Sequence, residues 1–181
     1  MNPTPRSTAL QSRPLLVLLG CLLLPCAAAA APPAAQSPPG SAGNPVVLGD
    51  LLISNVWARA TVPAVKVGAA YFTVENRGTQ ADTLIGASCP AASEAMFHRT
   101  TEQNGISHMA PAGRIEIPAG KTVKIEPGGL HLMLMGLKQP LHAGFLVPLT
   151  LKFEHAGEGL VQMHVVAISA PAPAAHDHPQ H

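Results

Sequence analysis

The sequence predicts an all-β domain, either a β-sandwich or a Greek-key barrel, over about residues 46–168. Three observations indicate this class. Short apolar runs rich in β-branched residues recur through this part of the chain, and several alternate with polar residues. Turn-forming stretches such as "NRG", "NG", "PAG", "PGG" and "HAGEG" separate these runs. No segment shows a long apolar period of about 3.6 residues, so we expect no core helix.

The expected strands follow one another in short steps. The first two are "LLISNVWAR", residues 51–59, and "VGAAYFTVE", residues 67–75, both rich in the β-branched and aromatic residues that suit a pleated surface. Trp57, Tyr71 and Phe72 are expected to be core aromatics. The other strands are expected over residues 82–87, 94–101, 106–110, 114–117, 121–126, 131–136, 147–155 and 160–168.

The stretch "HRTTEQNGISHM" predicts a β-hairpin. Asn-Gly at 104–105 lies between two extended segments, which is the strongest short-range signal for a two-residue type I′ turn. If the residues flanking this turn pair with each other, Thr100 lies opposite Met109 and His98 lies opposite Pro111. His98, Thr100 and Met109 then point to one face, because residues two apart on a strand share a face.

Other side chains of this region fall on defined faces by the same rule. Met96 shares the face of His98, whereas His108 points to the other face and is expected to be structural or exposed. In "HLMLMG", residues 131–136, His131 and Met133 lie on one face. Two separate strand pairs thus each offer one His and one Met.

Imidazole together with thioether is a chemically narrow combination. Thioether sulfur is neutral and soft, so it suits Cu(I) and contributes little to Zn²⁺, Mg²⁺ or Ca²⁺ sites. A blue-copper electron carrier would need a Cys beside two His. Beyond the first 31 residues only Cys89 remains, and it is expected to be a small buried residue. The residues therefore favour a Cu(I) site that releases its metal by ligand exchange.

The spacing of these residues resembles the periplasmic copper chaperones of the PCu(A)C type. In that family a His is followed by ten residues, a Met, twenty-one residues and then His-x-Met, a pattern that His98, Met109, His131 and Met133 complete. The stretches "PGGLHLMLMGL" and "PLTLKFEHAG" extend the resemblance, which covers about residues 50–168. It implies a cupredoxin-like β-barrel in which these four residues bind Cu(I) near the surface.

The resemblance also implies a role for the protein. It implies delivery of copper in the periplasm to a protein of respiratory oxidase assembly, best known for the dinuclear copper centre of cytochrome c oxidase; the recipient is an oxidase subunit or another copper chaperone. Family members often carry an acidic residue close to the first His, whereas this chain has Met96 and Arg99 there. Met96 is therefore a candidate auxiliary ligand, and Met135 is expected to pack in the core beneath the site.

The N-terminal region predicts export. Arg6 and Arg13 precede the apolar run "PLLVLLGCLLLPCAAAAA", which ends in several A-x-A cleavage sites around residues 27–31, so residues 1–31 are typical of a secretory signal peptide. Two alternatives remain. The first is a transmembrane anchor, for which the apolar run is short. The second is a lipoprotein signal, in which "LLGC" would present Cys21 for lipidation, although apolar residues continue after it.

Two segments outside the β domain have biased compositions. Residues 32–45 are rich in Pro, Ala, Gly and Ser and read as a linker. Residues 169–181 read as a flexible tail whose His176, His178 and His181 either chelate Cu(II), for which nitrogen ligands are preferred, or have no role. Loss of the signal leaves nine Lys and Arg against ten Asp and Glu, and a near-neutral chain shows no electrostatic footprint for nucleic acid.

Three functional hypotheses follow. The first is a non-enzymatic copper carrier, exported to the periplasm, that holds Cu(I) in its core site and handles Cu(II) with its tail. The second is a copper-dependent redox enzyme or thiol reductase, which the lack of a C-x-x-C pair and of any Ser, His and Asp grouping disfavours. The third is a metal-free β-sandwich that serves as an interaction or assembly module.

Overall fold

The computed structural model describes residues 44–173 of the chain. Within this range it is all-β, as predicted, with no helix, and therefore with none that could cross a membrane. The strands are β1 (Val46–Leu48), β2 (Leu51–Arg59), β3 (Val67–Asn76), β4 (Asp82–Ser88), β5 (Glu94–Gln103), β6 (Ile106–Pro111), β7 (Ile115–Ile117), β8 (Thr122–Ile125), β9 (Leu130–Met135), β10 (Leu146–Phe153) and β11 (Glu158–Val166).

The strand predictions hold with two kinds of difference. β1 is not among the predicted strands; it pairs with β2, with Val46 opposite Ile53. β10 and β11 both end two residues earlier than predicted, and β11 also begins two residues earlier. The turn between them closes at Gly157, whose φ of +83° favours glycine, so pairing resumes at once with Glu158 opposite Lys152.

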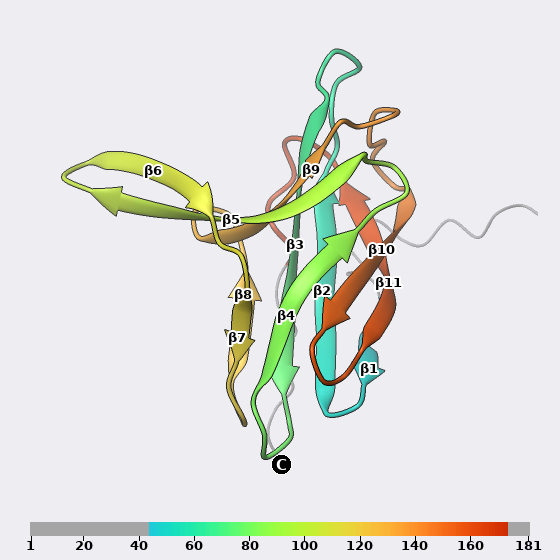
Figure 1. Ribbon diagram of the computed structural model, residues 1–181. Helices are drawn as coiled ribbons and strands as arrows, with labels where there is room; N and C mark the ends of the chain where they lie inside the picture. The colour runs from blue at the N-terminus through green and yellow to red at the C-terminus, as the bar shows by residue number, and fades with distance from the viewer. Residues whose placement is uncertain (1–43, 174–181) are drawn as a thin grey trace, which may run out of the picture. The chain divides into compact units, whose positions relative to one another are not determined.

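The strands form one sheet that curls around a single core (Figure 1). Its order is β6-β5-β9-β3-β2-β11-β10-β4-β7, with β1 added to β2 and β8 added to β3. Only β11 and β2 run parallel; the other pairs are antiparallel. This order places β5 beside β9, although β6, β7 and β8 separate them in the chain.

Alternation along the strands defines an inner and an outer face. Leu130, Leu132 and Leu134 of β9 point into the core. The intervening residues of β9, two of them predicted ligands, therefore point outward. Met135 is one of these outward residues and is half-buried, so the prediction that it packs in the core is wrong.

The aromatic residues divide between the two faces. Phe72 is 1% exposed and belongs to the core, as predicted. Trp57 is 4% exposed and buried, as predicted, although it lies outside the main core cluster. The prediction is wrong for Tyr71, which is only half-buried on the outer face. Adjacent strand residues point to opposite faces, so Tyr71 cannot share the side of Phe72. A register shift at Asn55, whose φ is +52°, puts Trp57 opposite Tyr71, with ring centroids 4.5 Å apart.

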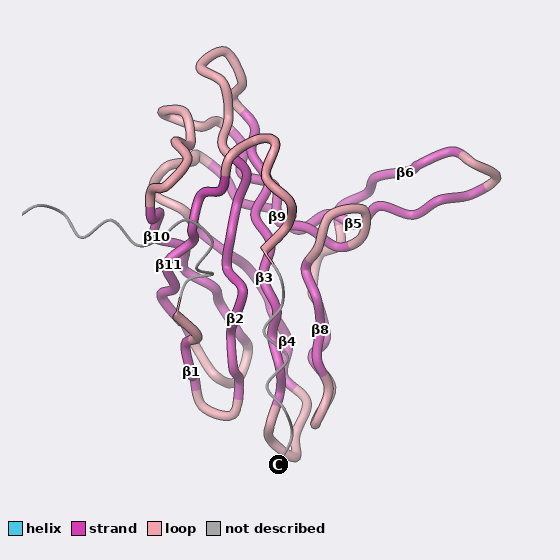
Figure 2. Tube along the Cα trace, turned by 180° about the vertical axis from the view of Figure 1, so that it is seen from behind, coloured by secondary structure: helices cyan, strands magenta, loops and turns pink. Residues whose placement is uncertain are grey.

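The segment that follows β11 is held against this outer face. Arg59 Nη1 donates hydrogen bonds to the carbonyls of Ile168 and Ala170, both at 2.8 Å. The same guanidinium lies 5.5 Å from the centre of the Trp57 ring, a cation–π contact. Figure 2 shows the loop after β11 passing over β2 and β3. Arg59 thus holds residues 168–170 against the end of β2.

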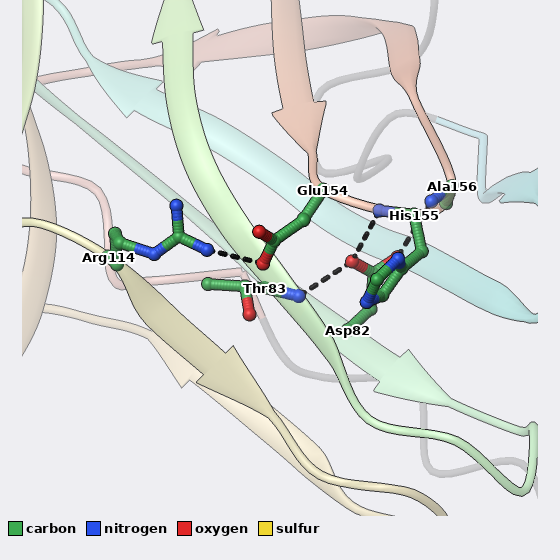
Figure 3. A network of polar contacts seen from close by, with 6 residues as sticks. All are labelled: Asp82, Thr83, Arg114, Glu154, His155 and Ala156. Atoms are coloured by element: carbon green, nitrogen blue, oxygen red, sulfur yellow. Dashed lines mark hydrogen bonds and ion pairs between the residues drawn. The ribbon is translucent and has the colours of Figure 1, made fainter.

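A buried carboxylate joins the start of β4 to the turn that follows β10 (Figure 3). Asp82 is 6% exposed, and its carboxylate accepts backbone N–H groups from Thr83, His155 and Ala156 at 2.6–3.0 Å. Burial raises the pKa of Asp82, but these three hydrogen bonds outweigh it and hold the pKa below its ordinary value. Beside this network Arg114 pairs with Glu154, at the surface.

The parts of the chain predicted to direct export and to bind Cu(II) lie outside the described residues. These are the predicted signal peptide over residues 1–31 with Cys21, nearly all of the predicted linker over residues 32–45, and His176, His178 and His181 of the tail.

Candidate metal centre

Three of the four predicted core ligands, together with the auxiliary candidate Met96, lie where β5 and β9 pair. His98 lies directly opposite His131, and Met96 lies directly opposite Met133. The two imidazole rings have centroids 6.1 Å apart and planes inclined by 27°. The sequence predicted one His and one Met on each of two strand pairs, but it did not predict that the two pairs lie side by side. The structure makes them neighbours in one ladder.

The turn before β9 fixes one imidazole. In "EPGGLH" a Pro-Gly turn, closed by a hydrogen bond from the N–H of Gly129 to the carbonyl of Glu126, places Gly128 at a φ of +81°, as a type II turn requires. The Gly129 carbonyl then accepts a hydrogen bond of 3.0 Å from the backbone N–H of Thr100 and lies 3.0 Å from Nδ1 of His131. An Nδ1–H donor leaves the lone pair of His131 Nε2 free for a metal.

The second imidazole has an unsatisfied nitrogen. Nδ1 of His98 is buried and has no hydrogen-bond partner among the described residues. A buried polar atom without a partner costs about 1–3 kcal/mol, so it requires a physical reason. A metal ion bound by His98 and His131 together would supply the missing partner. The residues present therefore fit a soft metal ion at this face.

Met109 lies on the hairpin formed by β5 and β6. The predicted register is confirmed: Thr100 lies opposite Met109 and His98 opposite Pro111. Asn104 and Gly105 have φ values of +54° and +77°, which fits the predicted type I′ turn. Met109 lies on the His98 face and is 58% exposed. One Met of the set is thus open to solvent, while His131 is only 6% exposed.

The described residues offer few ligands for a hard metal ion. Residues 44–173 contain no group of three or more His, Cys, Asp or Glu side chains placed to hold a metal. The face combines two imidazoles with the neutral thioethers of Met96, Met109 and Met133. His108 lies on the opposite face of the hairpin, exposed to solvent, as predicted. Such a donor set favours Cu(I) over Zn²⁺ or Ca²⁺.

The family model described as "Putative lipoprotein LpqE-like" matches residues 51–165, which include every strand of this site. The chain belongs to the LpqE-like family. A protein of Leifsonia xyli subsp. xyli described as "Putative lipoprotein Lxx21020" is 37% identical over 129 residues, which are 70% of this LpqE-like chain and 76% of the relative.

Two solved structures of copper-bound proteins are similar to the LpqE-like domain, and one of them carries the family name predicted from the spacing. The copper-bound PCuAC domain from PmoF2 is 26% identical with a TM-score of 0.60, and the match covers 68% of this chain and 98% of that one. The Cu(I) form of DR1885 from Deinococcus radiodurans is 32% identical with a TM-score of 0.52, covering 74% and 81%. The resemblance to PCu(A)C-type domains is confirmed.

The single Cys of the described LpqE-like domain takes no part in the face. Cys89 is 6% exposed, belongs to the core and forms no disulfide. Burial raises the pKa of its thiol above the ordinary value, and the adjacent backbone N–H groups and Lys138 offset this only in part. The thiol therefore stays protonated at neutral pH, unlike a metal-binding or redox-active thiolate.

Proposed function

We propose that the protein is an exported copper carrier that binds one Cu(I) through His98, Met109, His131 and Met133. The observation that carries this is the direct opposition of His98 and His131, with one imidazole oriented by Gly129 and the other left with an unpartnered nitrogen. The copper-bound state of the similar PmoF2 and DR1885 domains supports the choice of metal.

Copper transfer then proceeds by ligand exchange without catalysis. Met109 is the exposed ligand, so a donor atom of the recipient reaches the copper from the hairpin side. The Cu–sulfur bond to Met109 breaks as the bond to the recipient donor forms, and the oxidation state does not change. His131, buried and oriented by the Gly129 carbonyl, is the last ligand to leave. The recipient is a copper-accepting protein of respiratory oxidase assembly, such as the one that carries the dinuclear copper centre of cytochrome c oxidase.

The proposed site of action is outside the cytoplasm. The sequence of residues 1–31 predicts export to the periplasm, and the family and the Leifsonia relative are both described as lipoproteins. Lipidation at Cys21 and cleavage near residue 31 give mature chains of different mass. Intact-mass measurement of the protein from membrane and soluble fractions distinguishes them: a diacylated N-terminal Cys indicates an anchored carrier, and an unmodified Ala or Pro indicates a free one.

The histidine tail extends the proposal to Cu(II). His176, His178 and His181 are closely spaced imidazoles that suit Cu(II). In the sequence these histidines follow the segment, residues 168–170, that Arg59 holds on the outer face. We propose that the tail captures Cu(II) while the Met–His face holds Cu(I). Deletion of residues 174–181 then removes Cu(II) binding and leaves Cu(I) binding unchanged.

The decisive test is an anaerobic Cu(I) titration of the mature chain against a chromophoric chelator, followed by X-ray absorption of the loaded protein. The proposal expects one copper per chain with mixed sulfur and nitrogen ligation. A chain that cannot compete with the chelator would favour the metal-free interaction module. Copper that cycles between oxidation states with turnover of a substrate would favour the redox enzyme instead.

A further inference from the structure

Met96 occupies a position that the four proposed ligands leave unexplained. It lies on β5 directly opposite Met133, two residues before His98 and on the same outer face. Directly opposed residues have Cβ atoms about 4.5–5.5 Å apart, so the flexible thioethers of Met96 and Met133 can meet at one metal ion. Met96 is half-buried, neither packed in the core nor fully in solvent.

Met109, by contrast, has little structural support. β6 is an edge strand that pairs only with β5, and all six of its residues are exposed. The pairing of β5 with β9 ends at Arg99 and Leu130, with one further bond from the Thr100 N–H to the Gly129 carbonyl. Beyond this point no other strand of the described domain pairs with the hairpin, which extends away from the rest of the sheet in Figures 1 and 2.

The four residues Met96, His98, His131 and Met133 are therefore fixed by one ladder, and Met109 depends on the hairpin alone. We propose that Met96 is an exchange ligand that takes the place of Met109 when the hairpin moves away. The Cu–sulfur bond to Met109 breaks and a Cu–sulfur bond to Met96 forms. Both donors are neutral thioethers, so neither the charge of the site nor the oxidation state of copper changes.

This inference rests on the proposed copper site and adds a step to it. Copper held by Met96, Met133 and the two imidazoles stays on the body of the domain, while the side formerly covered by Met109 opens to a recipient. The carrier then does not lose its metal to solvent each time the hairpin opens. A two-His, two-Met set persists throughout the exchange.

The chain supplies a matched control on the same face. Met135 is half-buried like Met96, but it lies opposite Glu94. On β9 it is two residues further from His131 than Met133 is. Any general effect of removing an outer-face sulfur appears in Met135→Leu as well. Only a specific exchange ligand makes Met96→Leu behave differently.

The experiment uses the full mature chain loaded with Cu(I) without oxygen. X-ray absorption counts sulfur ligands in the wild type, in Met109→Leu, and in Met109→Leu combined with Met96→Leu or with Met135→Leu. We expect two sulfur ligands in the wild type, in Met109→Leu and in the double variant with Met135→Leu. We expect one in the double variant with Met96→Leu. A single sulfur in Met109→Leu overturns the inference.

Affinity provides a second readout. Met96→Leu alone is expected to change the Cu(I) affinity little, and Met109→Leu to lower it. The two together should lower it by about tenfold more than the product of their separate effects, because each Met compensates for loss of the other. Effects that simply multiply would overturn the exchange role. A wild-type chain that binds no Cu(I) overturns the proposed function itself, so the two failures are distinguishable.

Discussion

His98 and His131 lie directly opposite each other on adjacent antiparallel strands, with their ring centroids 6.1 Å apart. One of these rings is oriented by the Gly129 carbonyl, which also accepts the N–H of Thr100 on the neighbouring strand. The hydrogen bonds that join β5 to β9 thus also orient an imidazole. Pairing of β5 with β9 would therefore also prepare the proposed metal site.

Replacing the oriented imidazole should abolish tight copper binding. Loss of a partner that only orients a ligand typically costs about 10- to 100-fold in metal affinity, so His131→Ala should cost more than about 100-fold. His108→Ala is the matched control, because this His lies on the opposite face of the hairpin. Competition titration with a Cu(I) chelator measures both. Equal losses in the two variants would mean that the face does not bind the metal.

The hairpin turn should control how well Met109 is presented. Gly105 has a φ of +77° and open space around it, so Gly105→Ala adds backbone strain of about 1–2 kcal/mol without a clash. We expect faster amide hydrogen exchange over residues 101–108, weaker Cu(I) binding and little change in the midpoint of global unfolding. Gly86→Ala, also in open space but without a positive φ, controls for the added methyl group. Slow exchange retained at the hairpin would count against this role of the turn.

The Asp82 network should stabilise the domain in a pH-dependent way. The pKa of Asp82 is lowered in the folded state, so its contribution is present above the unfolded pKa of about 3.9 and is lost as the pH falls through the folded pKa. Asp82→Asn turns an amide NH₂ toward a backbone N–H and should cost about 1–3 kcal/mol at neutral pH.

Urea unfolding at several pH values measures this effect. The difference between wild type and Asp82→Asn should shrink as the pH falls from about 4 toward the lowered folded-state pKa of Asp82, because the unfolded carboxylate takes up its proton first. Glu116→Gln, at an exposed position on β7, should show no such dependence. A difference that is constant from neutral to acidic pH would show that the charge of Asp82 is not what stabilises the domain.

Arg59 should hold the C-terminal segment on the outer face. Arg59→Gln removes the cation–π contact with Trp57 and the forked donor that reaches the carbonyls of Ile168 and Ala170. We expect faster proteolysis after β11 and a shift in the emission of Trp57, the one tryptophan of the chain. Arg77→Gln removes an exposed ion pair with Glu75, worth about 0–1 kcal/mol, and should change neither measurement.

The part of the site that the sequence predicted correctly is local. The period of two placed His98 and Met109 on one face, and Asn-Gly at 104–105 fixed the hairpin register, since a two-residue turn leaves one pairing for the strands it joins. The errors arose where non-local packing decides. Tyr71 has the aromatic character of a core residue, but it is only half-buried, because the register shift at Asn55 pairs it with Trp57 on the outer face.

The sequence alone determined which side chains can bind a soft metal, how they are spaced, and on which face of its own strand each one lies. Only the tertiary structure decided that β5 and β9 are neighbours, that Met96 meets Met133, and that the Gly129 carbonyl orients His131. The physical reason is that alternation records which face of a strand is buried but not which strand lies beside it. That choice depends on how the intervening strands β7 and β8, together with the rest of the sheet, pack around a shared core.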